Sequence, residues 1–253
     1  MTTAPSPSDK ALKAFQTSML VMFAALLLLK ALTTLQWRMA QDTPLLHYAA
    51  FLMDRHHLVP YRDIFETSMP GTLAFHYLIG KLFGYGDAAF RVVDLTLLAV
   101  LLVATFLFML RFGRLVAVWS ALLFGLVYLA QGQAMSLQRD YVGVLPIAFA
   151  LLCIPDKAGT PVRLWRFLAT GLLFGLSVLI KPHLAIAIPI VFATLLAFRR
   201  HSQARSTRDL IRCAAVTGVS LLVPVTLALA WLDAHVHKRG ITGRSRDWLA
   251  FST

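Results

Sequence analysis

Long apolar stretches alternate with short polar segments from about residue 15 to residue 231. A helix needs about 20 apolar residues to cross roughly 30 Å of hydrocarbon, and windows of this kind recur along the chain. The pattern predicts an all-α polytopic membrane protein with about seven transmembrane helices. The predicted spans cover residues 15–35, 89–110, 115–130, 142–154, 165–180, 183–198 and 210–231. The fourth and fifth spans are short and would need flanking residues or a thinned bilayer.

Composition agrees with a membrane protein, since 58% of the residues are hydrophobic and 14% are charged. The formal net charge is +12, but the basic residues lie in short segments between apolar runs and form no single patch. This distribution argues against nucleic acid as a partner and favours anionic membrane lipids. Cys153 and Cys213 fall near the expected cytoplasmic ends of spans, so we expect reduced thiols and not a disulfide.

Lysine and arginine residues are concentrated in alternate connections, which sets the expected orientation. With the N-terminus in the cytoplasm, the two short outer loops contain only Arg139 and Lys181. The cytoplasmic segments contain Lys10, Lys13, Arg111, Arg114, Lys157, Arg163, Arg166, Arg199, Arg200, Arg205, Arg208 and Arg212. We therefore expect a cytoplasmic tail at 1–13, a transmembrane module at 14–231 and a polar tail at 232–253. A first outer loop at 36–88 lies within the module, and the first span is expected to be a retained anchor and not a cleaved signal peptide.

The first outer loop is predicted to carry two helices that lie on the membrane. Thr43 is a candidate N-cap before Pro44, and the apolar run that follows continues a helix to about residue 57. Asp42 then lies directly after the first span, where its carboxylate is held near the bilayer surface, as a catalytic base requires. The alternative is that Asp42 only helps Thr43 to cap the helix.

The second helix of this loop is predicted over residues 71–83 and ends at Gly84. It is too short to span a bilayer, so we expect it in the interface, with Phe75, Tyr77 and Phe83 facing lipid.

Charged residues precede this second helix. Charges beside a bilayer are costly unless they face water or each other, so a site is the first interpretation of such a group. Arg62 and Glu66 are candidate substrate contacts. The alternative is an interfacial ion-pair network that also includes Asp63.

The order of these features resembles a known family. An aspartate after the first span is followed by an amphipathic helix, the turn PYRDIFETSMPG, a short apolar helix, LFGYGDAAFR and a second span. This order is similar to GT-C membrane glycosyltransferases that use polyprenyl-phosphate sugars, in particular bacterial relatives of protein O-mannosyltransferases and lipid A aminoarabinose transferases. The resemblance extends over residues 31–231, but its specific part is 41–91. It implies an inner-membrane location, and it implies that this chain corresponds to the N-terminal, seven-span part of longer relatives.

The resemblance also implies residue roles. Asp42 corresponds to the catalytic aspartate of the first outer loop, and Arg139 and Asp140 resemble a second charged site at the rim of the cavity. Lys181 resembles a cation that contacts the lipid-linked phosphate, and His183 follows it in the same outer turn. Some relatives place a lysine just before the proline of the first-loop turn, where this chain has Thr67, Ser68 and Met69.

The implied reaction moves a sugar from an outer-leaflet polyprenyl phosphate to an acceptor hydroxyl or amine with inversion, and Asp42 acts as the base. We expect no cofactor. The chain has no GxxxxGK loop or GxGxxG turn, in keeping with a lipid-linked donor that needs no nucleotide site. A partner chain that supplies an acceptor-binding domain is also implied.

Three alternatives remain open. A divalent metal site is one, although its ligands lack a standard spacing. Its candidate ligands are Asp42, His47, His56, His57 and His76. A membrane transporter or lipid-handling protein is the second, although no clear internal symmetry is visible. A catalytically incomplete fragment is the third.

Gly171 and Gly175 form a GxxxG pair, which we expect to serve packing within the chain and not a dimer.

Overall fold

The computed structural model describes residues 7–154, 163–189 and 207–237, and within these ranges the chain is helical and forms no β-strand. The all-α expectation is confirmed for this part of the chain. The helices are α1 (Pro7–Thr33), α2 (Thr43–Arg55), α3 (Pro70–Phe83), α4 (Asp87–Met109), α5 (Arg114–Ala130), α6 (Arg139–Cys153), α7 (Leu164–Ile180) and α9 (Thr207–His237). Short 3-10 turns are η1 (Thr34–Gln36), η2 (Leu110–Phe112), η3 (Gln133–Met135) and η4 (Pro182–Ile186).

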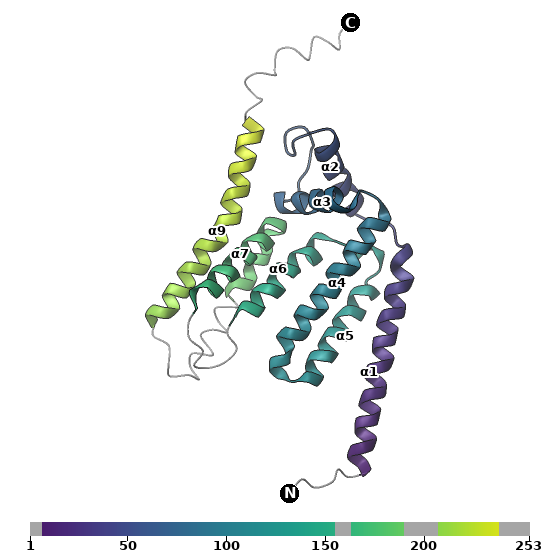
Figure 1. Cartoon of the computed structure of the whole chain (residues 1–253). Coiled ribbons are helices and arrows are strands. Elements are labelled where there is room, and N and C mark those ends of the chain that lie inside the picture. The colour runs from purple at the N-terminus through teal and green to yellow at the C-terminus, as the bar shows by residue number, and fades with distance from the viewer. Residues whose placement is uncertain (1–6, 155–162, 190–206, 238–253) are drawn as a thin grey trace.

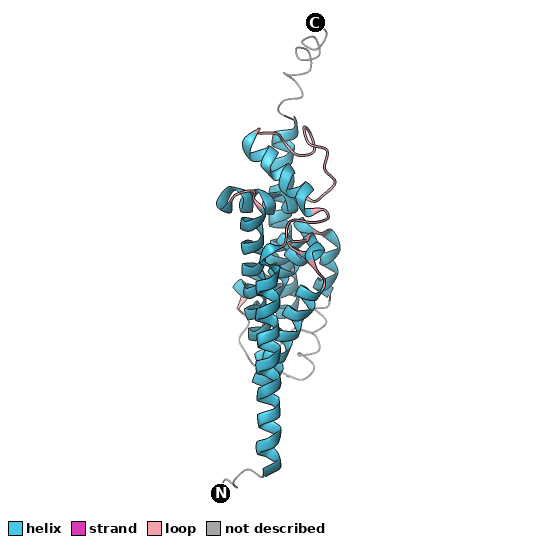
Figure 2. Cartoon of the chain, turned by 90° about the vertical axis from the view of Figure 1, so that its right-hand side faces the viewer, coloured by secondary structure: helices cyan, strands magenta, loops and turns pink. Residues whose placement is uncertain are grey.

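Six helices stand side by side in a row, in the order α1, α5, α4, α6, α7 and α9 (Figure 1). The row is broad in one view and narrow in the view turned by 90° (Figure 2). The helices α2 and α3 pack on each other at one end of the row, and α3 also packs on α7. The loop between α5 and α6 and the turn after α7 reach the same end. This end of the row therefore carries α2, α3, the loop between α5 and α6 and the turn after α7.

Three described helical segments are long and apolar enough to cross a membrane, namely Ser8–Gln36, Asp87–Phe112 and Ile211–His235. The helices α5 and α7 are apolar but have 17 residues each, and α6 has 15. At 1.5 Å per residue these helices are only about 23 to 26 Å long, which is less than the hydrocarbon thickness. The predicted sixth span begins as η4 and lies mostly outside the described residues.

Helical structure extends beyond the predicted first and last spans at both ends. Helix α1 begins at Pro7, so residues 7–13 of the predicted N-terminal tail are helical. Asp9 in its first turn lies near the positive end of the helix, which favours this early start. At the other end, α9 continues to His237, beyond the predicted boundary at residue 231.

The GxxxG pair of α7 packs within the chain, as predicted. A Cβ atom added at Gly171 would lie 2.3 Å from the carbonyl oxygen of Thr217 in α9. A Cβ atom at Gly175 would lie 2.4 Å from the carbonyl oxygen of Leu221. Only glycine allows the backbones of α7 and α9 to approach this closely.

The two helices of the first outer loop form close to their expected positions. Helix α3 ends at Gly84, which has a φ of 94°, as its glycine predicts. The expected lipid-facing set was partly wrong. Phe83 is exposed, but Phe75 packs against the main hydrophobic core and Tyr77 lines a cavity. A helix that rests on other helices buries more of its surface than a helix that lies on lipid alone.

Candidate functional site

Asp42 and Arg139 meet at the end of the helix row that carries α2 and α3. Nη2 of Arg139 donates to Oδ2 of Asp42 at 2.8 Å, and Nη1 donates to Oγ of Ser68 at 2.9 Å. The Asp42 side chain is 55% exposed and that of Arg139 is 27% exposed, so both remain accessible. Nε of Arg139 is buried and has no hydrogen-bond partner in the described part of the chain. The guanidinium therefore retains donor capacity for a further anionic group.

The capping interpretation of Asp42 was wrong. Asp42 is the N-cap residue of α2 by position, but its side chain makes no capping hydrogen bond. It adopts helical φ and ψ angles, from which a side chain reaches the first-turn N–H groups poorly. Thr43 is fully buried, and its Oγ1 donates to the carbonyl oxygen of Ser136 at 3.3 Å.

A second ion pair begins at the next residue of α6. Nζ of Lys181 donates to Oδ1 of Asp140 at 2.5 Å. Nε2 of His183 lies 3.7 Å from the same oxygen. Because Arg139 and Asp140 are consecutive at the start of a helix, their side chains point in different directions and reach different partners. The structure thus joins five of the predicted site residues into two adjacent groups, one of Asp42 with Arg139 and one of Asp140 with Lys181 and His183.

The other two predicted site residues have different partners. Nη2 and Nε of Arg62 donate to the carboxylate of Asp63, at 2.5 and 2.8 Å, and Nη1 donates to the carbonyl oxygen of His235 in α9 at 3.0 Å. The hydrogen bonds that Arg62 donates to Asp63 raise the pKa of Arg62. Oε1 of Glu66 accepts the backbone N–H groups of Thr67 and Ser68, both at 2.8 Å. These contacts order the 59–69 segment. The Arg62–Asp63 pair agrees with the ion-pair alternative, whereas the backbone contacts of Glu66 were not evident from the sequence.

Ser68 connects this segment to the site. The hydroxyl of Tyr61 donates to the Ser68 carbonyl oxygen at 2.5 Å, while the Ser68 hydroxyl accepts from Arg139. Burial, with a smaller contribution from the charge of Glu66, raises the pKa of Tyr61 to about 12. Tyr61 is therefore a neutral donor at physiological pH. Tyr61 holds Ser68 beside the Asp42 pair.

Arg91 and Asp94 form a buried ion pair that was not predicted from the sequence. Nη1 of Arg91 forms a very short contact with Oδ2 of Asp94 one turn along α4, and both side chains are almost completely buried. The same nitrogen donates to Oγ of Ser136 at 2.8 Å. Two opposite charges three residues apart inside an apolar run were the available signal.

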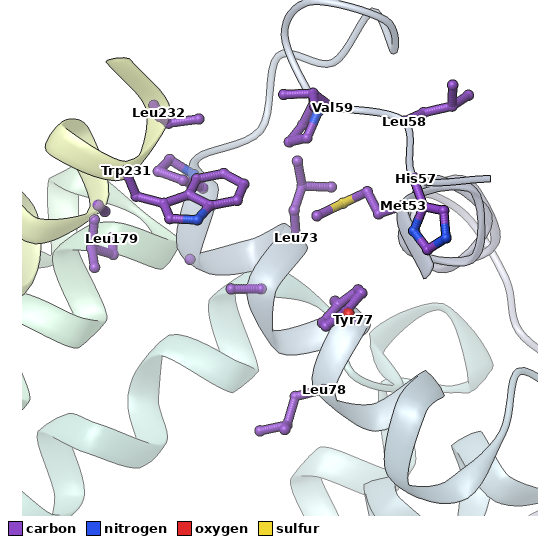
Figure 3. A pocket seen from close by; sticks show the side chains of 15 residues that line it. Met53, His57, Leu58, Val59, Leu73, Tyr77, Leu78, Leu179, Trp231 and Leu232 are labelled. Carbon is purple, nitrogen blue, oxygen red and sulfur yellow. The ribbon is translucent and has the colours of Figure 1, made fainter. Parts of the chain in front are cut away.

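An apolar cavity of about 740 Å³ lies between α3, the 57–60 segment and the C-terminal part of α9 (Figure 3). Its wall contains Leu73 and Tyr77 of α3, Met53 of α2, and Trp231 of α9. Pro70 and Gly71 also line it, and they directly follow the segment that holds Ser68. A cavity of this size and lining suits a hydrophobic chain.

The candidate metal ligands do not assemble. Among residues 7–154, 163–189 and 207–237, no group of three or more His, Cys, Asp or Glu side chains is arranged to hold an ion. Nδ1 of His47 and Nδ1 of His76 lie 3.4 Å apart in a buried pair. Burial, and then the neighbouring histidine, lowers the pKa of His76 to about 3, and burial also lowers the pKa of His47. Both imidazoles are therefore neutral and pack α2 on α3.

No protein-family model, curated protein or solved structure matches this chain. The site must be interpreted from its own geometry and from the residue pattern of the first outer loop.

Proposed function

We propose that this chain is a membrane glycosyltransferase that moves a sugar from a polyprenyl-phosphate donor to an acceptor hydroxyl or amine. The observation that carries the proposal is the accessible Asp42–Arg139 pair, which places a carboxylate and a cation 2.8 Å apart. An apolar cavity supports it, because its lining includes Pro70, two residues after the Ser68 that binds Arg139. A lipid phosphate sugar has the matching parts, namely an apolar tail, an anionic link and a reactive anomeric carbon. Guanidinium groups bind phosphate through paired hydrogen bonds.

In the proposed reaction, the acceptor oxygen or nitrogen attacks the anomeric carbon opposite the phosphate. The bond from that carbon to the phosphate oxygen breaks, and its electron pair leaves with the polyprenyl phosphate. Arg139 and Lys181 stabilise the charge that develops on the phosphate. Asp42 accepts the proton of the acceptor, and a single displacement inverts the anomeric carbon.

Donor binding is also what frees the base. In the structure the guanidinium of Arg139 occupies one carboxylate oxygen of Asp42. An incoming phosphate competes for the same guanidinium, whose Nη1 and Nη2 each carry a second N–H group. Asp42 is then released toward the acceptor only when a donor is present.

The proposal extends to topology and partners. We propose that the seven predicted segments all cross or enter the bacterial inner membrane, with the first outer loop on the extracytoplasmic side. The short helices α5, α6 and α7 would then require a locally thinned bilayer around the row. A partner chain would supply the acceptor-binding domain.

The experiment uses the whole chain in proteoliposomes with a panel of polyprenyl-phosphate sugars and detects released polyprenyl phosphate. Ala74→Trp is the informative variant, because Ala74 lines the cavity and lies on the exposed side of α3. We expect the bulky side chain to reduce release by at least about tenfold without altering insertion. Donor binding without release, with partner membranes added, would contradict transfer and favour a lipid-handling protein.

A further inference from the structure

The buried ion pair of α4 lies between the two segments that carry the exposed pair. Oδ1 of Asp94 accepts the hydroxyl of Tyr128 at 2.5 Å and the backbone N–H of Leu137 at 3.1 Å. Nη1 of Arg91 donates to the hydroxyl of Ser136. The loop at 136–137 is thus bound by both members of the pair, two residues before Arg139.

The same pair also fixes the chain that leads to Asp42. Nη2 of Arg91 forms a very short hydrogen bond with Oγ1 of Thr34, and its guanidinium lies 4.7 Å from the centre of the Trp37 ring. Further along, the Thr43 hydroxyl donates to the carbonyl oxygen of Ser136. Asp42 is therefore connected to the buried pair on both sides, through Trp37 before it and through Thr43 after it.

Backbone conformation supports this connection. Gln41 has a φ of 54° and Leu137 has a φ of 48°, and residues other than glycine rarely adopt such values. Gln41 directly precedes Asp42, and Leu137 lies two residues before Arg139. Such a conformation persists only where surrounding contacts hold it, and the Leu137 N–H to Asp94 bond is one such contact.

We infer that Arg91 and Asp94 are positioning residues that hold Asp42 and Arg139 at bonding distance from each other. Neither side chain touches the exposed pair. They act through Ser136, Leu137 and Thr43, which are all buried. The inference rests on the proposed function for its catalytic consequence, but the placement of the two segments is independent of the reaction.

The test replaces the pair and reads out local order. Arg91→Met/Asp94→Leu exchanges the buried ion pair for apolar side chains of similar size, a change that usually preserves folding. Hydrogen–deuterium exchange of the whole chain in nanodiscs is compared with that of the wild type. We expect at least tenfold faster exchange in peptides covering 37–46 and 131–142, with peptides of α7 and α9 unchanged. Unchanged exchange in both site peptides, or an equal increase in every peptide, would overturn the inference.

A milder variant keeps the inference testable if the double variant fails to fold. Thr43→Val removes only the hydroxyl bond to Ser136 and should accelerate exchange at 37–46 alone. Thr96→Val is its matched control, because the Thr96 hydroxyl bonds the carbonyl oxygen of Val92 on the exposed side of α4. Equal effects of Thr43→Val and Thr96→Val would overturn the inference.

Catalysis supplies a separate readout. In Arg91→Met/Asp94→Leu and in Thr43→Val we expect kcat to fall by about 10²-fold, because a misplacement of about 1 Å can have this effect. KM for the donor should change less than about threefold. A rise in KM with an unchanged kcat would overturn the positioning role. A wild-type chain that transfers no sugar would contradict the proposed function, and the exchange data would still decide the placement.

Discussion

Nη2 of Arg139 lies 2.8 Å from Oδ2 of Asp42, although 97 residues separate the two in the chain. The contact joins the start of α6 to the start of α2. It brings a carboxylate and a cation together from segments that are far apart in the chain. Every prediction about transfer depends on this relationship.

The first prediction concerns the phosphate. Replacing both cations, as Arg139→Gln/Lys181→Gln, should weaken binding of a polyprenyl phosphate by at least about tenfold, because each removes a charge-assisted contact. Exposed ion pairs contribute about 0–1 kcal/mol to stability, so the variant should insert and fold normally. Binding is measured in nanodiscs with a labelled lipid phosphate.

The matched control for this variant is Lys81→Gln. Lys81 is an exposed cation of α3 whose Nζ lies 3.9 Å from Asp54, outside the proposed site. Equal losses of binding in the two proteins would indicate a general effect of surface charge and would contradict the specific role.

The second prediction concerns topology. Phe65 is 95% exposed in the 59–69 segment, and Phe112 is 62% exposed at the opposite end of the row. In a background without Cys153 and Cys213, an impermeant thiol reagent applied to intact cells should label Phe65→Cys and not Phe112→Cys. The reverse pattern would contradict the orientation and the outer-leaflet donor.

The third prediction concerns the contact between α7 and α9. Gly175→Ala should lower the free energy of unfolding by about 1–3 kcal/mol, because the added methyl group would overlap the Leu221 carbonyl. Gly218→Ala in α9 is the matched control, since a Cβ atom there meets nothing within 4 Å. This control should raise stability by up to about 1 kcal/mol. Similar values for the two variants in a thermal unfolding assay would contradict the close approach.

The fourth prediction concerns acid. A histidine whose folded pKa is lower than its unfolded pKa of about 6.5 is kept neutral by folding. Its contribution to stability is complete above about pH 6.5 and is lost as the pH falls from there toward about 3, the pKa of His76. Between pH 7 and pH 4.5 the wild type should lose about 1–3 kcal/mol more than His47→Leu/His76→Leu. Equal pH dependence of the two proteins would show that the pair is not responsible.

Local features of the fold were predictable from the sequence. The spans predicted at 115–130 and 165–180 agree with α5 and α7 to one residue, because an apolar run bounded by charges marks a buried helix clearly. Gly84 marked the end of α3. Helix α1 begins at Pro7, before the predicted start of the first span at residue 15.

Contacts between distant segments were less accessible. The sequence placed Asp42 and Arg139 on the same side of the membrane, but it could not indicate that they bind each other. It offered Glu66 as a substrate contact, whereas its carboxylate accepts two backbone N–H groups of its own loop. Arg91 and Asp94 both fell within the predicted span 89–110 and attracted no role, because their partners come from three other segments.

The most direct measurement is sugar transfer by Asp42→Asn in proteoliposomes, followed as released polyprenyl phosphate. Asparagine preserves the shape of the side chain but cannot accept a proton, so release should fall by about 10² to 10⁴ while expression stays within about twofold and donor binding is not weakened. Asp54→Asn, which changes another carboxylate of α2, should retain wild-type release. Wild-type release by Asp42→Asn would contradict the role of Asp42 as the base.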